Sequence, residues 1–396
     1  MRHVLHYPGQ PSLAPEIVRA EGCHVYDAAG NRWLDLESGV WCTPLGHGHP
    51  RMLAVLQRQA AAMIHAGFNV SPPVVDAAAA EILDQLNFPG GRCVFLCSGS
   101  EAVEYGLRVM RRVQGRPRVV TMADSYFGAY GQATARDGDD WWCDHWLADC
   151  ATCPYLEDCA EFCDHWTAIP HDDLGGLLLE PGSSAGLVRF PPAKFVRALA
   201  RTVGDNGGLV MVNEVTTGLG RTGRWFGYEH FGITPDLVAL GKGLGNGYPV
   251  SCLAMNADVV ARLDGQPLAY AQSHQNDPLG AAVAREVLQV LRDEHLIERA
   301  AATGEHLGAA LANLASRCDR VAEVRGRGLM WLIRLHDDAE ETLTAGLHEQ
   351  LARRGYLVGR RLGQAALRLD PPLGIAEDLL DGFVAELSGL VGRSRR

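Results

Sequence analysis

The chain has 396 residues, of which 47% are hydrophobic and 21% are charged, enough for a large core and more than one domain. The formal net charge is −11 and there is no basic stripe, so nucleic acid is not an expected partner. The apolar runs are too short or too broken to span a bilayer, and the first ten residues lack the apolar core of a signal peptide. We therefore expect a cytoplasmic protein with no membrane partner, in which the eleven cysteines are reduced thiols or metal ligands rather than disulfides.

Apolar strand-like segments and helical segments alternate along most of the chain. In chain order, the pattern predicts a hairpin at 22–36, a helix at 50–65, a strand at 93–97, a helix at 98–113, strands at 119–122 and 177–179, a helix at 195–203, strands at 209–212 and 237–240, and a helix at 277–291. Such alternation is typical of an α/β fold with a mostly parallel sheet and helices on both faces. From about Leu296 onward, helices and short strands indicate a smaller C-terminal domain.

The segment from Gly208 to Pro249 carries the strongest chemical signal. Asn213 ends one buried strand, and Lys242 stands between two glycines at the end of the next. Ligands of parallel sheets lie at the carboxyl ends of the strands. A buried lysine loses its charge easily and becomes a nucleophilic amine, so Lys242 could hold an aldehyde cofactor as a Schiff base. A solvated loop lysine is the alternative.

The start of the helix at 98–113 is a candidate anion site. Ser98 and Glu101 have the spacing of a capping box. The backbone N–H groups of Gly99 and Ser100 would be free there, and with the helix dipole they favour a phosphate. An ordinary helix cap is the alternative interpretation.

Several strings together resemble the class III aminotransferases, fold-type I enzymes that use pyridoxal 5′-phosphate (PLP). These are GLVMVNEVTTGLGRTG with the following lysine loop, SGSEAVEYGLRVMRR, SYFG, LLLEP, SHQNDPLG and ALRLDPPL. The resemblance implies a large PLP-binding domain at about 50–290 and a smaller α+β domain built from both termini, 1–49 and 291–396. It also implies a homodimer, because sites in this family lie at the subunit interface.

The resemblance assigns roles to residues of this chain. Lys242 would be the catalytic lysine that holds the cofactor and moves protons as general acid and base. The other cofactor contacts would be Gly99 and Ser100 at the phosphate, Tyr126 over the pyridine ring, Glu180, Asn213, Thr216, and Ser273 reaching the neighbouring subunit's phosphate. The substrate would meet Arg368, which could clamp a carboxylate, together with Trp41 and Phe127.

The chain differs from the family at several positions that would contact the cofactor or the acceptor. Asn213 stands 29 positions before Lys242, where the family has an aspartate that keeps the pyridine nitrogen protonated. A neutral amide can hydrogen-bond this nitrogen but cannot favour its charged form, which makes a weaker electron sink. Thr216 replaces a glutamine, and Ala129 and Ala185 replace an arginine and an acid, so 2-oxoglutarate is not assigned as acceptor.

These departures leave three functional hypotheses. The first is an aminotransferase that acts on an amine or amino acid and a carbonyl acceptor. The second is a PLP-dependent racemase or epimerase, which needs only limited proton transfer. The third is a non-catalytic sensor on a PLP fold.

A cysteine-rich segment, 143–163, has no counterpart in ordinary class III enzymes. Cys150, Cys153, Cys159 and Cys163 fall within fourteen residues, and four thiolates this close can surround one metal centre. Their spacing resembles the auxiliary iron–sulfur segment of SPASM domains. We expect an iron–sulfur cluster, of the [4Fe–4S] type, with a structural or redox-regulatory role; zinc, or free thiols and disulfides, are the alternatives. Further possible ligands are Cys143, His145 and His165.

Overall fold

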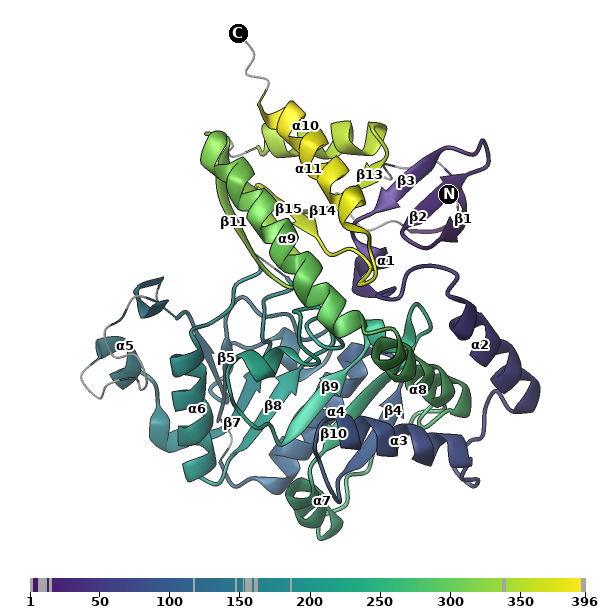
Figure 1. Ribbon diagram of the computed structural model, residues 1–396. Coiled ribbons are helices and arrows are strands. Elements are labelled where there is room, and N and C mark those ends of the chain that lie inside the picture. The colour runs from purple at the N-terminus through teal and green to yellow at the C-terminus, as the bar shows by residue number, and fades with distance from the viewer. Residues whose placement is uncertain are drawn as a thin grey trace.

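The computed structural model in Figure 1 describes residues 3–5, 13, 16–116, 118–146, 148–151, 153, 159, 163–185, 187–336 and 340–392. A large sheet with helices forms the lower part of the molecule in this view, and two small sheets with three helices lie above it. None of the described helices combines the length and the apolar character needed to cross a membrane.

The large sheet has the strand order β4-β10-β9-β8-β7-β5-β6. Its strands are β4 (Arg92–Leu96), β5 (Arg118–Met122), β6 (Trp141–Asp144), β7 (Leu174–Leu179), β8 (Leu209–Asn213), β9 (Leu237–Leu240) and β10 (Ser251–Met255). Neighbours from β9 through β8, β7 and β5 to β6 are parallel, whereas β10 runs antiparallel to both β9 and β4. Strands β7 to β10 are buried along their whole length, as expected for a sheet covered on both faces.

Alternate residues of the central strands point to opposite helical layers. Met211 of β8 belongs to the apolar cluster that includes Leu107 on α4, whereas Val210 and Val212 belong to the cluster that includes Phe195 on α6. The helices around this sheet are α2 (Pro50–Ala62), α3 (Pro73–Gln85), α4 (Gly99–Val113), α6 (Ala193–Asp205), α7 (Ala257–Asp264) and α8 (Pro278–Asp293). This layering gives the sheet a rigid edge on which strand-end residues can be held.

Both ends of the chain contribute to one of the small sheets. It contains β1 (Ile17–Glu21), β2 (His24–Asp27), β3 (Arg32–Asp35) and β13 (Tyr356–Leu357), with β13 parallel to β3. The other contains β11 (Val321–Arg327), β12 (Met330–Leu335), β15 (Ala366–Leu369) and β14 (Gly359–Arg361). The helices of this part are α9 (Leu296–Arg317), α10 (Thr342–Arg353) and α11 (Glu377–Val391).

The predicted α/β fold class is confirmed. The hairpin within 22–36 forms as β2 and β3, and the helix at 98–113 begins with the predicted capping box, in which Ser98 and Glu101 bond each other's backbone N–H groups. The helix predicted at 50–65 ends at Ala62. The pattern missed β6, which has only four residues, and it also missed β10, although β10 lies in a mostly apolar run between Pro249 and Asn256. The domain boundaries at 49 and 290 stay a prediction.

Candidate active site

Four of the predicted site residues follow the carboxyl ends of parallel strands. Tyr126 comes after β5, Glu180 directly after β7, Asn213 ends β8 and Lys242 follows β9. Because these strands are parallel, all four residues emerge at one edge of the sheet. A cavity of about 160 Å³ opens there, lined by Gly99, Ser100, Val103, Tyr126, Phe127, Gly128, Asn213, Val215, Thr216 and Lys242.

The Lys242 side chain is held inside the protein. Its Nζ donates a hydrogen bond of 2.9 Å to Oγ1 of Thr216, and it lies 4.8 Å from the centre of the Trp41 ring. Burial lowers the pKa of Lys242, and the charges of Arg368 and Arg361 lower it further, against the opposite effect of Glu180. Lys242 is therefore a buried amine that loses its proton more easily than a surface lysine.

The first turn of α4 forms the anion end of the cavity. Gly99 and Ser100 are its first residues, so their N–H groups lack partners within the helix. A Cβ atom at Gly99 would approach Val215 to 2.6 Å, which reserves this position for glycine. Opposite, Gly128 has φ +135°, and the Ser100 hydroxyl accepts a bond of 3.0 Å from the Ala129 N–H. The backbone cradle and the helix dipole fit the phosphate of PLP.

Asn213 and Glu180 hold the backbone of Tyr126 from both sides. Asn213 Nδ2 donates to the Tyr126 carbonyl at 3.0 Å, and the Tyr126 N–H donates to Glu180 Oε2 at 2.9 Å. The Ser184 hydroxyl donates to the other Glu180 oxygen at 2.5 Å. Burial raises the pKa of Glu180 to about 7, although these hydrogen bonds act in the opposite direction.

Trp41 reaches the cavity region through an unusual turn. Ser38 to Trp41, named α1, all have positive φ, between 50° and 66°. Left-handed backbone costs non-glycine residues about 1–2 kcal/mol each, so the turn needs support. Both carboxylate oxygens of Asp35 accept N–H bonds from the turn, and the Ser38 hydroxyl donates to the Asp370 carbonyl at 2.6 Å. The Trp41 indole Nε1 is buried and has no hydrogen-bond partner in the described part of the chain.

Arg368 is committed to a buried ion pair with Asp370. Both residues have 0% exposure. The Arg368 Nε and Nη2 groups donate to the two Asp370 oxygens at 3.1 and 2.9 Å, and Nη1 donates to the Ser184 carbonyl at 2.8 Å. The two guanidinium N–H groups that would bind a substrate carboxylate are therefore already bonded to Asp370. Asp370 was missed in the sequence, although the spacing of two places it on the same side of an extended chain as Arg368.

Of two further predicted contact residues, Phe127 lies at the cavity and Ser273 does not. Phe127 lines the cavity and is packed against Arg136, whose guanidinium lies 5.2 Å from the ring centre. Ser273 is exposed and is not among the lining residues of the cavity. The predicted contact of Ser273 with a neighbouring subunit's cofactor stays a prediction.

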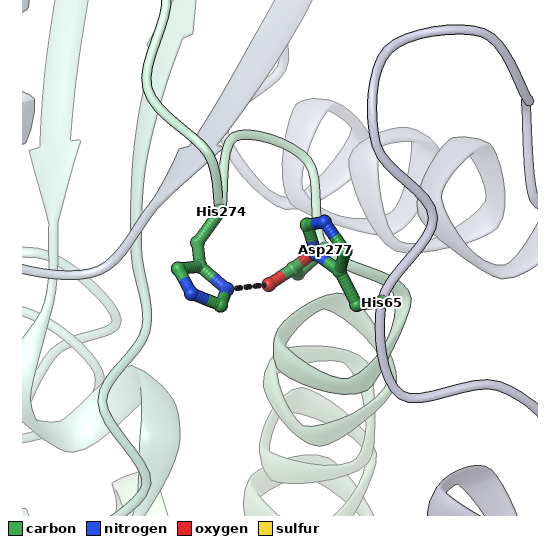
Figure 2. Close-up of side chains that lie close together, drawn as sticks. All are labelled: His65, His274 and Asp277. Carbon is green, nitrogen blue, oxygen red and sulfur yellow. Dashed lines mark hydrogen bonds and ion pairs between the residues drawn. The ribbon is translucent and has the colours of Figure 1, made fainter.

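Next to Ser273, two histidines share one carboxylate (Figure 2). His65 and His274 each place Nδ1 2.5 Å from a different oxygen of Asp277, the residue that precedes α8. Among the described residues, this is the group of three potential metal ligands whose atoms lie within 4.8 Å of one another. The hydrogen bonds account for the arrangement without a metal ion, and they fix the loop that carries Ser273.

The cysteine-rich segment begins on β6, the outermost strand of the large sheet. Burial raises the pKa of Cys159 to about 11, and the neighbouring Cys150, Cys163 and Cys153 raise it further, whereas Lys194 lowers it. Cys143 lies on β6, where its Sγ donates to the Arg136 carbonyl at 3.5 Å. The electrostatic effects on Cys159 therefore come from all three other cysteines of the predicted set, and not from Cys143.

The fold and the strand-edge site define a PLP-dependent enzyme of fold-type I. The family model described as aminotransferase class-III matches residues 8–391, and the chain belongs to this family of PLP-dependent aminotransferases. The acetylornithine aminotransferase of Mycobacterium bovis is 32% identical over 98% of this chain and 93% of its own. That of Streptomyces coelicolor is 31% identical over 98% and 92%.

Solved structures agree with this assignment. The ornithine aminotransferase of Toxoplasma gondii has a TM-score of 0.82 at 25% identity and covers 97% of this chain and 92% of its own. An aminotransferase of Bacillus anthracis has a TM-score of 0.88 at 23% identity, covering 99% and 97%, and it supports the fold alone.

Proposed function

We propose that the protein transfers an amino group from a primary amine to a carbonyl acceptor, and that its cysteine-rich segment carries a metal centre separate from this chemistry. The observation that supports the reaction is the buried, hydrogen-bonded Lys242 at the strand edge, facing a cavity that ends in the N-terminus of α4. PLP supplies an electron sink that makes a C–H bond beside the substrate nitrogen acidic. The chain must then bind PLP, move the proton and exclude water.

Each of these tasks has a residue near the cavity. Gly99, Ser100 and the first turn of α4 would hold the phosphate, and Lys242 would hold the aldehyde carbon. Because burial lowers the pKa of Lys242, the displaced amine can take a proton from the substrate carbon and return it elsewhere. The Thr216 hydroxyl, 2.9 Å from Nζ, would keep this amine directed into the cavity. The Trp41 ring would exclude water beside it.

Asn213 favours a second candidate, a racemase or epimerase. One of its amide hydrogens is used by the Tyr126 carbonyl, and the other can be donated to a neutral pyridine nitrogen. This contact does not favour a charged ring, so the electron sink is weaker than with an aspartate. The two reactions separate in an assay with amino donors. Formation of the pyridoxamine form supports transamination, and solvent-deuterium exchange at carbon without any carbonyl product would establish the racemase instead.

For the substrate, we infer an amine without a carboxylate at the position that faces Arg368. The two forked N–H groups of Arg368 are occupied by Asp370, and Ala129 and Ala185 supply no charge. The unpartnered Trp41 Nε1–H can instead donate to a neutral substrate oxygen. This inference differs from the carboxylate clamp expected for Arg368.

The substitution Asp370→Asn tests this substrate class. It removes the charge that neutralises Arg368, so we expect the ratio of kcat/KM for an amino acid to that for its decarboxylated amine to rise about tenfold or more. Using the ratio cancels losses of stability, which are expected because a buried arginine loses its counter-charge. The matched double variant Asp370→Asn with Arg368→Met should lose the gain. An unchanged ratio would contradict the role of Asp370.

We also propose a homodimer. Exposed Ser273 lies next to the exposed ends of the 63–70 segment, where Ile64, Phe68 and Val70 are 57%, 66% and 52% exposed. An apolar strip of this kind suits burial between two copies. Light scattering of the holoenzyme should give twice the chain mass, and a monomer that retains full activity would refute the proposal.

A further inference from the structure

A second, much smaller cavity adjoins the PLP cavity. Its volume is about 10 Å³, which holds one water-sized occupant and is too small for a carboxylate, a phosphate or a sulfate. The two cavities share Val215 and Thr216 as lining residues, and the glycines on either side of Lys242 also line the small one. The rest of its wall is formed by Trp41, Pro44, Gly218, Leu219 and Arg221. An atom bound here would therefore lie next to the proposed amine chemistry.

Two residues of this wall carry buried N–H donors without partners. Trp41 and Arg221 are 7% and 3% exposed. Neither the Nε1–H of Trp41 nor the Nη2 group of Arg221 has a hydrogen-bond partner among the residues that the structure describes. Leaving a buried donor unbonded costs about 1–3 kcal/mol, and more when the group is charged. Two such donors beside one cavity indicate that a hydrogen-bond acceptor binds between them.

The positive charge of Arg221 is not neutralised by the hydrogen bonds that its guanidinium makes in the described part of the chain. Nη1 donates to the carbonyl oxygens of Leu329 and Pro371, at 3.0 and 2.5 Å, and both are neutral acceptors. Asp370 precedes Pro371, but both of its carboxylate oxygens are bonded to Arg368. Because a buried charge is costly unless it is paired, an anion stabilises Arg221 more than a neutral acceptor does.

The other lining groups also suit an occupant that only accepts hydrogen bonds. The side chains of Pro44, Val215 and Leu219 are apolar. The Thr216 hydroxyl accepts a bond from Lys242 Nζ, and its own proton can be donated into the cavity. The described residues that line the cavity include no carboxylate. A water molecule would also have to donate its two hydrogens here, whereas a halide ion has none to donate.

We propose that this cavity binds a single chloride ion between the Arg221 guanidinium and the Trp41 indole N–H. The ion would give both donors a partner and would fix the Trp41 ring, whose centre lies 4.8 Å from Lys242 Nζ. The Trp41 N–H is also the group offered above to a neutral substrate oxygen. Chloride and such a substrate would therefore compete. This competition rests on the proposed function, whereas binding of the ion does not.

Diffraction from holoenzyme crystals soaked in sodium bromide tests the site directly, because bromide replaces chloride and scatters X-rays anomalously. We expect an anomalous peak within hydrogen-bonding distance of Arg221 Nη2 and Trp41 Nε1. An ordered water at this position without an anomalous peak would overturn the proposal. The wild-type crystal decides this question even if no variant folds.

Thermal unfolding of the holoenzyme provides a measurement in solution. Replacing sodium gluconate by sodium bromide at constant ionic strength should raise Tm until the site is saturated. Trp41→Phe keeps an aromatic ring but removes the N–H, so the half-saturating bromide concentration should rise about tenfold. Trp33→Phe is the matched control, because the buried Trp33 Nε1 donates to the Ala352 carbonyl at 2.8 Å, and it should leave this concentration unchanged. Equal shifts in both variants, or no saturable rise in the wild type, would contradict the site.

Initial rates in bromide and in gluconate test the competition. A higher KM with an unchanged kcat in bromide supports it, and an unchanged KM in a protein that shows the bromide peak would refute it. A protein with the bromide peak but no turnover of any amino donor would refute the proposed function and leave the ion site established.

Discussion

The PLP cavity and the cysteine-rich segment lie along the same edge of the large sheet, but their functional side chains are held in place in different ways. Asn213 and Lys242 stand at the ends of buried central strands, and their side chains already make hydrogen bonds within the chain. The four thiols follow the outermost strand. The described regular structure of the connection that carries them is two 3₁₀ turns, Ala148–Ala151 and His171–Asp173, and the four-residue α5 (Asp164–Thr167). The first site is organised by the sheet before PLP binds. At the second, the proposed metal centre would hold the groups together, as metals do in small folds.

The largest expected effect is at the organised site. Lys242→Ala removes the amine that would hold PLP and move the proton, so turnover should fall by about a thousandfold or more. Borohydride treatment followed by mass spectrometry should find a PLP adduct on Lys242 in the wild-type protein and none in the variant. Iron content should not change, because the two sites are independent.

The matched control is Lys194→Met, which removes a buried lysine from the other region. It should keep the adduct and the turnover. A wild-type protein that forms no reducible adduct at Lys242 would instead favour a non-catalytic sensor on this fold.

The next effect concerns the charge buried beside the PLP cavity. The pKa of Glu180 rises from an ordinary 4.5 to about 7 on folding, chiefly through burial. Below pH 4.5 the carboxyl is neutral in both the folded and the unfolded state, and above pH 7 the folded state bears the full cost of burying the charge. The free energy of unfolding should therefore fall as pH rises from 4.5 to 7, by up to about 3 kcal/mol.

Glu180→Gln removes this pH dependence while it keeps an acceptor for the Tyr126 N–H. Urea unfolding of the holoenzyme at pH 5, 6, 7 and 8 should show a smaller decline for the variant than for the wild type. Glu349→Gln, at an exposed position, is the control. Parallel curves for the wild type and Glu180→Gln would show that Glu180 is already ionised at pH 5.

The difference between local patterns and long-range partners explains which features could be predicted from the sequence. The positions of Lys242 and Asn213 at the ends of buried strands, and of Gly99 at a helix start, could be predicted because strand ends and helix caps are local patterns in the chain. The left-handed turn that ends at Trp41 could not, because its support from Asp370 comes from the other end of the chain. The ion pair of Arg368 with Asp370 was missed for a different reason. The spacing was visible, but only burial of both side chains shows that the pair is closed to solvent.

The edge strand illustrates a second limit. β6, with the sequence Trp-Trp-Cys-Asp, has no apolar alternation, and it forms because β5 offers a parallel neighbour. The cysteine spacing was visible in the sequence, whereas the bond from Lys194 to the Cys153 carbonyl required the fold. Local chemistry is thus predictable, and long-range partners are not.

The smallest expected effect is at the cysteine-rich segment. Lys194→Met keeps the apolar stem of the side chain but removes a positive charge beside the Cys153 carbonyl. If the proposed metal centre is the expected iron–sulfur cluster, it should then become harder to reduce. The shift in its reduction potential should be negative and roughly tens of millivolts, from one screened charge at short range. Potentiometric titration followed by electron paramagnetic resonance measures it. Lys194→Arg keeps the charge and should return the potential toward the wild-type value. A potential that is equal in all three proteins would place Lys194 outside the electrostatic reach of the cluster, and its bond to the Cys153 carbonyl would then be purely structural.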